Sequence, residues 1–244
     1  MESLLFGAVQ GISEFLPISS SGHLYVLKRI IGLRANLLPF FVFLHLATLI
    51  AIGIFFAGKI KRVFSNDQLR LKILIITLIT GFGALIIKIF LGSFFDLKYL
   101  VSFCFLANSF ILLSKNKNIE FREINEVTLK DSLVLGLFQA IAVFPGISRS
   151  GITISILLKR GFRPQAAFDL SFIMAIPIII IAFLVESKEL FTMAIDPLYL
   201  ASGFICAFIF GLVALKVLER VVLAKKLKHF GYYCLLAFVV SLIV

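Results

Sequence analysis

Two short stretches carry most of the reactive side chains of an otherwise apolar chain. Residues 13–23 read SEFLPISSSGH and combine a carboxylate, four hydroxyls and an imidazole. Residues 145–153 read PGISRSGIT and add a guanidinium and three hydroxyls after a Pro-Gly pair. The first set can do acid–base or nucleophilic chemistry, and a guanidinium at a helix start binds phosphate. The candidate site residues are Glu14, Ser19, Ser20, Ser21, His23, Gly146, Ser148, Arg149, Ser150 and Thr153.

The rest of the chain has the composition of a polytopic membrane protein. Of its 244 residues, 61% are hydrophobic and 15% are charged, and the mean hydropathy is +1.09. About a quarter of the residues of a soluble domain are charged. Apolar runs near the ~20 residues that cross a bilayer recur along the sequence. We predict spans at Phe40–Ala57, Ile73–Leu91, Leu97–Leu113, Leu170–Val185, Leu198–Val217 and Phe230–Val244.

The net charge of +11 is concentrated at the ends of these spans. Runs such as KIKR at 59–62 and KKLKH at 225–229 flank apolar segments, and no separate basic domain remains to bind nucleic acid. The charge therefore indicates topology. Three cysteines fall inside predicted spans without a paired spacing, which favours free apolar thiols over a disulfide or metal role.

An internal repeat relates the two reactive stretches. At an offset of 129 residues they align without gaps, with 8 identities in the 16 positions from 7 to 22, and Gln10 meets Gln139. We therefore expect a single all-α membrane domain made of two repeats, about 1–115 and 131–244. A polar linker at about 115–131 joins them.

Each repeat opens with a segment that contains too much Gly, Pro and Ser for a plain spanning helix. These segments are Leu4–Leu27 and Leu133–Leu158. Irregular backbone at membrane depth is tolerated only where it is buried in protein or lines a wet cavity, so we predict re-entrant helix–loop–helix hairpins. Three spans then follow each hairpin, and this odd number inverts the second repeat. Inverted repeats place their site near the midplane, where the two broken segments meet.

Basic residues give the orientation. Residues 59–72, 115–131, 159–163 and 216–228 would share one side of the membrane and hold 17 of the 24 Lys and Arg. Six others would lie on the opposite side. The positive-inside rule makes the first side cytoplasmic. Both termini and the entrance to the first hairpin are then expected to face outward.

The two repeats differ at two positions that carry reactive side chains. Glu14 aligns with Val143, and Ser20 aligns with Arg149, so each repeat alone is incomplete. Brought together, the hairpins would supply one carboxylate, one guanidinium and one imidazole to a composite site. Ionisable residues inside a membrane usually mark such sites. The alternatives are that Glu14 and Arg149 form a purely structural ion pair, that His23 is a core histidine, and that the serines only cap helices.

The two motifs together resemble a known family. Residues 10–23, QGISEFLPISSSGH, and residues 145–153 resemble the paired signatures of the bacterial undecaprenyl-diphosphate phosphatases, the bacitracin-resistance proteins. The likeness covers essentially the whole chain. It implies a multi-pass enzyme of the bacterial cytoplasmic (inner) membrane that hydrolyses undecaprenyl diphosphate to the monophosphate carrier of peptidoglycan synthesis, and so serves cell-wall biogenesis, cell shape and bacitracin resistance.

The resemblance also implies an outward-facing site, a lipid diphosphate substrate within membrane lipid, and dependence on Mg²⁺ or Ca²⁺. One position departs from the family pattern. The first signature commonly opens with a second glutamate, and here that residue is Gln10, which would offer a cation only an amide carbonyl. Glu14 remains the leading metal ligand. A homodimer is an arrangement that the sequence leaves open.

Roles follow from the chemistry of diphosphate cleavage. Arg149, Thr153 and hairpin amides would hold the diphosphate, and Glu14 would act as cation ligand or general base. Ser20 would attack directly with His23 as base, or would orient a water. Substrate contacts are expected from Gln10, Ser19, Ser21, Gly146, Ser148, Ser150 and Thr153.

A transporter or flippase for a lipid phosphate or anion is the main alternative, because inverted repeats with broken helices also build secondary transporters. The constellation of Glu, Ser, His and Arg favours the enzyme. An acid-phosphatase type of lipid phosphatase is set aside, because no histidine lies between Arg149 and His229. Neither His45 nor His229 matches a signature.

Overall fold

The structure is a computed structural model, and it describes residues 1–33, 36–92, 99–114, 121–186 and 196–244. Over these ranges it is helical, and the only β pairing is an isolated bridge between Arg122 and Phe162. The helices are α1 (Glu2–Phe15), α2 (Ser20–Ile31), α3 (Leu38–Phe55), α4 (Ala57–Phe64), α5 (Asp67–Leu91), α6 (Leu100–Leu113), α7 (Leu129–Ile141), α8 (Arg149–Lys159), α9 (Pro164–Ile173), α10 (Ala175–Glu186), α11 (Pro197–Leu223) and α12 (Lys228–Ile243), with a 3₁₀ turn at Ile124–Glu126.

Four apolar stretches among the described residues are long enough to cross a membrane: α3, α5, α11 and the run Pro164–Val185 formed by α9 and α10. The protein is a multi-pass membrane protein. The predicted bounds need correction at several places. The spans expected at Leu97–Leu113 and Phe230–Val244 are the shorter helices α6 and α12, of 14 and 16 residues. Positions 97 and 98 lie outside the described residues.

Two other spans differ from their predicted form because the backbone breaks. The segment predicted at Leu170–Val185 begins earlier, at Pro164, and is interrupted at Met174 between α9 and α10. The first span ends at Phe55 rather than Ala57, and a separate short helix, α4, follows. This helix carries Lys59, Lys61 and Arg62, and apolar and basic residues in one short helix suit a position at the membrane surface.

Both Gly-, Pro- and Ser-rich segments form a helix, a loop and a second helix. In the first, α1 and α2 are separated by residues 16–19, and in the second, α7 and α8 are separated by residues 142–148. The second helix of each pair begins with the same cap. The hydroxyl of Ser19 accepts the Gly22 N–H at 3.4 Å, and the hydroxyl of Ser148 accepts the Gly151 N–H at 3.1 Å. Such caps satisfy amides that a helix start leaves open.

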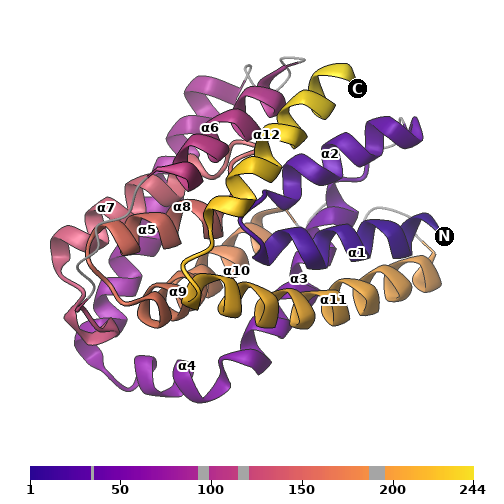
Figure 1. Cartoon of the computed structure of the whole chain (residues 1–244). Helices are drawn as coiled ribbons and strands as arrows, with labels where there is room; N and C mark the ends of the chain where they lie inside the picture. Colours follow the sequence, from indigo (N-terminus) through magenta and orange to yellow (C-terminus); the bar gives the residue numbers. More distant parts are fainter. Residues whose placement is uncertain (34–35, 93–98, 115–120, 187–195) are drawn as a thin grey trace.

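Small residues bring the first hairpin close to the opposite end of the chain. Figure 1 shows α1 running alongside α11. A Cβ on Gly7 would lie 2.3 Å from the Gly203 carbonyl oxygen, and one on Gly11 would lie 2.4 Å from that of Ala207. Only glycine permits this approach, the usual device for packing helices in membranes. In the second hairpin α7 packs on α5, where a Cβ on Gly136 would meet Ile79 at 2.7 Å.

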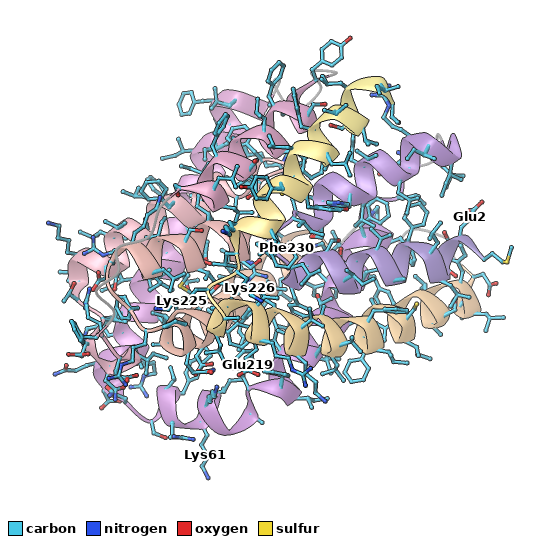
Figure 2. All side chains as sticks on the ribbon, in the orientation of Figure 1. Glu2, Lys61, Glu219, Lys225, Lys226 and Phe230 are labelled. Atoms are coloured by element: carbon cyan, nitrogen blue, oxygen red, sulfur yellow. The ribbon has the colours of Figure 1, made fainter. Side chains whose placement is uncertain are left out.

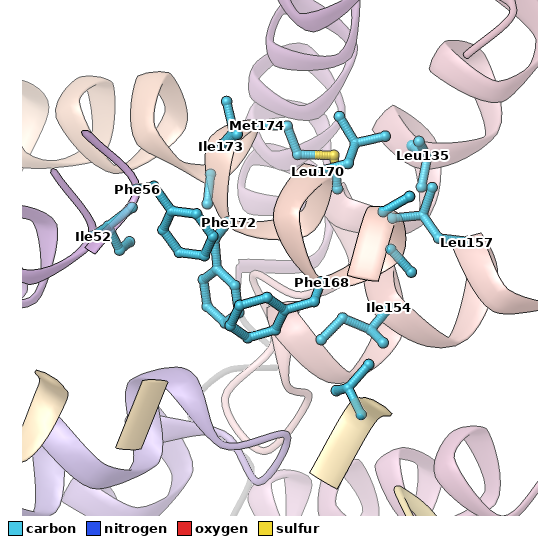
Figure 3. Packing of buried hydrophobic residues seen from close by; sticks show 14 of the residues in the cluster. Ile52, Phe56, Leu135, Ile154, Leu157, Phe168, Leu170, Phe172, Ile173 and Met174 are labelled. Atoms are coloured by element: carbon cyan, nitrogen blue, oxygen red, sulfur yellow. The ribbon is translucent and has the colours of Figure 1, made fainter. Parts of the chain in front are cut away.

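Aromatic rings pack together in the same hydrophobic core as Ile154 and Leu157 of α8 (Figure 3). Phe56, Phe168 and Phe172 are fully buried, and the Phe168 and Phe172 ring centroids lie 5.1 Å apart. The guanidinium carbon of Arg149 lies 5.9 Å from the centre of the Phe172 ring. The core therefore supports the side chain of Arg149 from one side.

The chain termini and the basic helix α4 lie at opposite ends of the molecule (Figure 1). Both chain termini point toward one end, and α4 lies at the other (Figure 1). Glu2 and Lys61 mark these opposite ends in Figure 2. The start of α1 lies beside the start of α11, because the Ser3 and Ser202 hydroxyl oxygens are 2.7 Å apart.

Candidate active site

The loops of the two hairpins meet directly. The Gly146 N–H donates to the Ser19 hydroxyl oxygen at 3.0 Å. Gly146 has φ of +106°, a conformation that glycine adopts without strain, and a Cβ there would clash with Cys104 at 2.6 Å. The Pro-Gly pair of the second motif thus allows its loop to reach the first.

The side chain of Asn108 on α6 forms hydrogen bonds with both loops. It is fully buried, its side-chain amide donates to the Pro17 carbonyl oxygen at 2.9 Å, and its Oδ1 accepts the Ser148 N–H at 3.1 Å. A single side chain therefore bonds to the backbone of each loop. These bonds fix the position of one hairpin relative to the other.

Glu14 and Arg149 form an ion pair across this junction. Glu14 lies in the last turn of α1 and Arg149 is the first residue of α8. An Arg149 Nη2–H donates to Glu14 Oε1 at 2.7 Å, and the two side chains are 14% and 8% exposed. The expectation that these residues, 135 apart in sequence, meet at one place is confirmed.

The second carboxylate oxygen of Glu14 has three further neighbours. The Ser20 hydroxyl donates to Glu14 Oε2 at 2.6 Å, and the Gln10 amide donates to it at 3.2 Å. Gln10 is one helical turn before Glu14 on α1, whereas Ser20 is the first residue of α2. His45 of α3 places Nε2 at 3.4 Å from the same oxygen. Glu14 is thus the centre of the site.

Two atoms of this cluster are buried with no hydrogen-bond partner among the described residues: Arg149 Nη1 and Gln10 Oε1. A buried polar group without a partner costs free energy, and a ligand or ion commonly satisfies it. The nitrogen offers a donor to an anion, and the amide oxygen offers an acceptor to a cation. Gln139, the repeat counterpart of Gln10, also has an unpaired Oε1, but its amide donates to Thr80 instead.

The hydroxyls of the second motif bond mainly to the protein itself. Ser148 caps α8, Ser150 donates to the Phe15 carbonyl oxygen at 2.9 Å, and Thr153 donates to that of Arg149 at 2.8 Å. In the first motif, the Ser19 hydroxyl accepts from Gly146, whereas Ser21 is exposed. Of the six hydroxyls assigned to substrate contact or catalysis, capping and loop packing therefore account for four, all except those of Ser20 and Ser21.

His23 faces α12 rather than Glu14. Its Nδ1 lies 2.7 Å from the Ser19 carbonyl oxygen and its Nε2 lies 2.8 Å from the Tyr233 hydroxyl, with the two rings stacked. These rings form one wall of an apolar cavity whose other lining side chains include Val26, Phe105 and Leu236. The base closest to Ser20 in this arrangement is Glu14, and a role for His23 in proton transfer stays a prediction.

His45, Asn108 and Tyr233 contribute to the junction but lie outside both motifs. The sequence carried a signal for two of them. His45 and Asn108 are polar residues within predicted spans, and such residues usually mark functional or packing sites. Neither has a motif around it, so their proximity to the hairpins could not be inferred from spacing.

The predicted divalent cation would have one carboxylate and one amide oxygen as its oxygen ligands in this cluster. Among the described residues, no three His, Cys, Asp or Glu side chains gather at one place. The Gln10 amide nitrogen contacts the Glu14 carboxylate at 3.2 Å, and the Oε1 of the same amide is buried without a partner among the described residues. Hard divalent cations take carboxylate and amide oxygens as ligands.

These features define a class: a helical membrane protein with an ionisable site at the junction of two broken-helix hairpins. The chain belongs to the bacitracin resistance protein BacA family, whose model matches residues 3–240. Similar proteins named undecaprenyl-diphosphatase occur in Thermosipho melanesiensis (39% identity over 98% of this chain and 97% of the relative), Thermosipho africanus (38%, 100% and 100%) and Methanococcus vannielii (37%, 97% and 97%).

Proposed function

We propose that this protein is a membrane phosphatase that hydrolyses undecaprenyl diphosphate to undecaprenyl phosphate and inorganic phosphate. This reaction would recycle the lipid carrier of peptidoglycan synthesis. The names of its relatives support the substrate and the reaction. The observation that carries the proposal is the Arg149 guanidinium, which binds Glu14 through Nη2 and keeps a buried Nη1 available for a phosphoryl oxygen.

Arg149 would bind the terminal phosphate at the start of α8. A helix N-terminus attracts anions through its unpaired amides and its dipole. Phosphoryl transfer depends mostly on positioning and on neutralising charge at the phosphoryl oxygens. The pairing with Glu14 and the contact with the Phe172 ring would hold the guanidinium in one orientation.

Ser20 would be the nucleophile and Glu14 its base. As Ser20 Oγ bonds to the terminal phosphorus, its proton passes to Glu14 Oε2, 2.6 Å away. The bond from that phosphorus to the bridging oxygen breaks, and undecaprenyl phosphate leaves. Water then hydrolyses the seryl phosphate and releases inorganic phosphate. If Ser20 instead orients an attacking water, no phosphoseryl intermediate forms, and trapping the denatured protein after brief exposure to labelled substrate distinguishes the two routes.

Glu14 and Gln10 would also hold a divalent cation, Mg²⁺ or Ca²⁺ in the family pattern. A bound cation would neutralise part of the negative charge of the diphosphate. The unpaired Gln10 Oε1 supports this assignment.

The two repeats would have inverted topology in the bacterial inner membrane, with the site and both termini outside. Element order supports the repeat, because α8 begins at residue 149 and α2 at residue 20, the offset found in the sequence. The distribution of 17 of the 24 Lys and Arg supports the orientation. An outward site would meet the diphosphate on the side where cell-wall synthesis releases it.

Phosphate release from undecaprenyl diphosphate by the detergent-purified protein tests the proposed reaction. We expect turnover that falls when a chelator is added. A lipid carrier or flippase would release no phosphate, because transport requires two compartments. If well-folded protein released no phosphate, a transporter or flippase would therefore become the favoured function.

A further inference from the structure

An apolar cavity of about 130 Å³ lies between α2, α6 and α12, and the mechanism described above does not use it. The stacked rings of His23 and Tyr233 form one wall. The other lining side chains, among them Val26, Phe105 and Val240, are apolar. The chemistry of these walls indicates what the cavity can hold.

The two rings already bond to partners through their polar atoms. His23 Nδ1 lies 2.7 Å from the Ser19 carbonyl oxygen, which only accepts hydrogen bonds, so Nδ1 carries the ring proton. In the neutral ring, Nε2 then accepts the Tyr233 hydroxyl at 2.8 Å. With these bonds made, the cavity presents apolar surface to a guest. A cavity of this kind excludes water and takes an apolar ligand.

The α12 wall of the cavity is accessible from the bilayer. Leu236 and Val240 line the cavity and are 61% and 39% exposed. Exposed apolar side chains on a helix of a membrane domain contact lipid tails. An apolar chain can therefore enter the cavity without crossing water. Pockets that hold a whole drug-sized ligand measure about 300–1,000 Å³, so this smaller cavity suits a short stretch of one chain.

The cavity also borders the junction of the two hairpins. Ser19 bonds to His23 through its carbonyl oxygen and accepts the Gly146 N–H through its hydroxyl at 3.0 Å. The Phe105 ring lies at the same place, because a Cβ on Gly22 would be 2.6 Å from the Phe105 Cζ and 3.0 Å from the Gly146 Cα. One end of the cavity is therefore next to the loops of both hairpins.

We propose that this cavity holds the part of the substrate's prenyl chain that is next to the diphosphate. The inference rests on the proposed function, because it assigns the chain-binding part of the same site. A chain attached to a diphosphate at the hairpin junction passes between α2 and α12 on its way into the lipid. This continuity with the junction favours the substrate chain over an acyl chain of a bulk phospholipid, which shares its apolar chemistry.

Two neighbouring valines on α12 provide a matched pair of variants. Val240 lines the cavity, whereas Val239 is 49% exposed and is not among the lining residues. Val240→Phe fills part of the cavity, and Val239→Phe adds the same bulk outside it. Val26→Phe fills the cavity from α2 and serves as a second variant if Val240→Phe does not fold. Thermal melting checks that each variant is folded.

The measurement is phosphate release by the full-length, detergent-purified protein from dimethylallyl diphosphate and farnesyl diphosphate, which carry one and three isoprene units. Because burial of each further methylene strengthens binding about fourfold, wild-type kcat/KM should be at least about tenfold higher for farnesyl diphosphate. Val240→Phe and Val26→Phe should lower this ratio about fourfold or more, mainly through KM. Val239→Phe should keep the wild-type ratio.

Photolabelling with a benzophenone-bearing prenyl diphosphate tests the cavity without turnover. We expect it to label α12 in wild type, less so in Val240→Phe, and excess farnesyl diphosphate should prevent the labelling. Three results would overturn the inference: an unchanged substrate ratio in the folded cavity variants, no labelling of α12, or labelling that excess phosphatidylglycerol prevents and farnesyl diphosphate does not. Phosphate release by the same preparation would still support the proposed function. Labelling of α12 that farnesyl diphosphate prevents, without phosphate release, would support the cavity assignment and refute the reaction.

Discussion

Glu14 and Arg149 differ in how far the protein itself satisfies their polar atoms. Glu14 uses one oxygen for Arg149 and the other for Ser20, Gln10 and His45. Arg149 uses Nη2 for Glu14 and leaves Nη1 unpaired among the described residues. A planar guanidinium can serve both partners at once, whereas an ammonium group has a single nitrogen. The chemistry at residue scale therefore depends on the identity of these two side chains.

Arg149→Lys should lose at least about tenfold in kcat/KM while inserting and purifying normally, because one nitrogen cannot hold Glu14 and a phosphoryl oxygen in the same geometry. Phosphate release by the purified variant measures the loss. Arg163→Lys is the matched control, since Arg163 forms an exposed ion pair with Glu123. Near wild-type turnover of Arg149→Lys would leave Arg149 with a structural role.

Glu14→Gln separates catalysis from charge balance. The amide keeps the size of the side chain but cannot take the Ser20 proton, so phosphate release should fall by about 10²-fold or more. If Glu14 only neutralises Arg149, the variant would instead bury an unpaired guanidinium and lose about 3–5 kcal/mol of stability. Thermal melting and turnover of the folded fraction, measured together, decide between these roles. An unstable variant with fully active folded molecules would contradict the catalytic role.

The hairpin loops are held in place by α6, an element without a recognisable motif. Asn108 bonds to the Pro17 carbonyl oxygen and to the Ser148 N–H, so it connects the two loops that carry Glu14 and Arg149. The precision of the site thus depends on a helix that contributes no reactive side chain. Misplacing reacting groups by about 1 Å can cost about 10²-fold in rate.

Asn108→Leu should therefore lower kcat by at least about tenfold and reduce stability, because each backbone group left without a partner costs about 1–3 kcal/mol. Ser109→Ala provides the control on the same helix. It removes the buried bond from Ser109 to the Gly231 carbonyl oxygen at 2.8 Å but touches neither loop. We expect Ser109→Ala to lose stability with full turnover per folded molecule. Equal turnover loss in both variants would show that α6 acts only through general stability.

The sequence predicted the hairpins and their meeting because the signals are local and repeated. Gly, Pro and Ser break each helix where α2 and α8 begin, and the offset of 129 appears in both the residues and the caps. The break at Met174 was not predicted, although Pro177 lies four residues after Ile173, whose carbonyl it cannot bond to in a continuous helix. The contacts of His45 and Asn108 could not be predicted from the sequence either. Their partners in the hairpins, Glu14, Pro17 and Ser148, lie 31 to 91 residues away in sequence, so tertiary packing alone brings them together.

At the scale of the whole molecule, the chain termini and the basic helix α4 are separated from each other. Both termini lie toward one end, and the basic helix α4 lies at the other (Figure 1). The close packing of α1 on α11 keeps the N-terminus beside the start of α11. With 17 of 24 Lys and Arg expected on the α4 side, the positive-inside rule predicts that this side is cytoplasmic.

Cysteine labelling in intact cells tests that orientation. Glu2→Cys and Asp196→Cys place exposed thiols on the side expected to face outward, whereas Lys61→Cys and Lys226→Cys place exposed thiols on the expected basic side. In a Cys206→Ser background, a membrane-impermeant maleimide should label the first pair and leave the second pair protected. All four should react after permeabilisation, which confirms that protection comes from the membrane and not from burial. Labelling of Lys61→Cys with protection of Glu2→Cys would reverse the orientation and move the Glu14–Arg149 site away from the side where its proposed substrate is released.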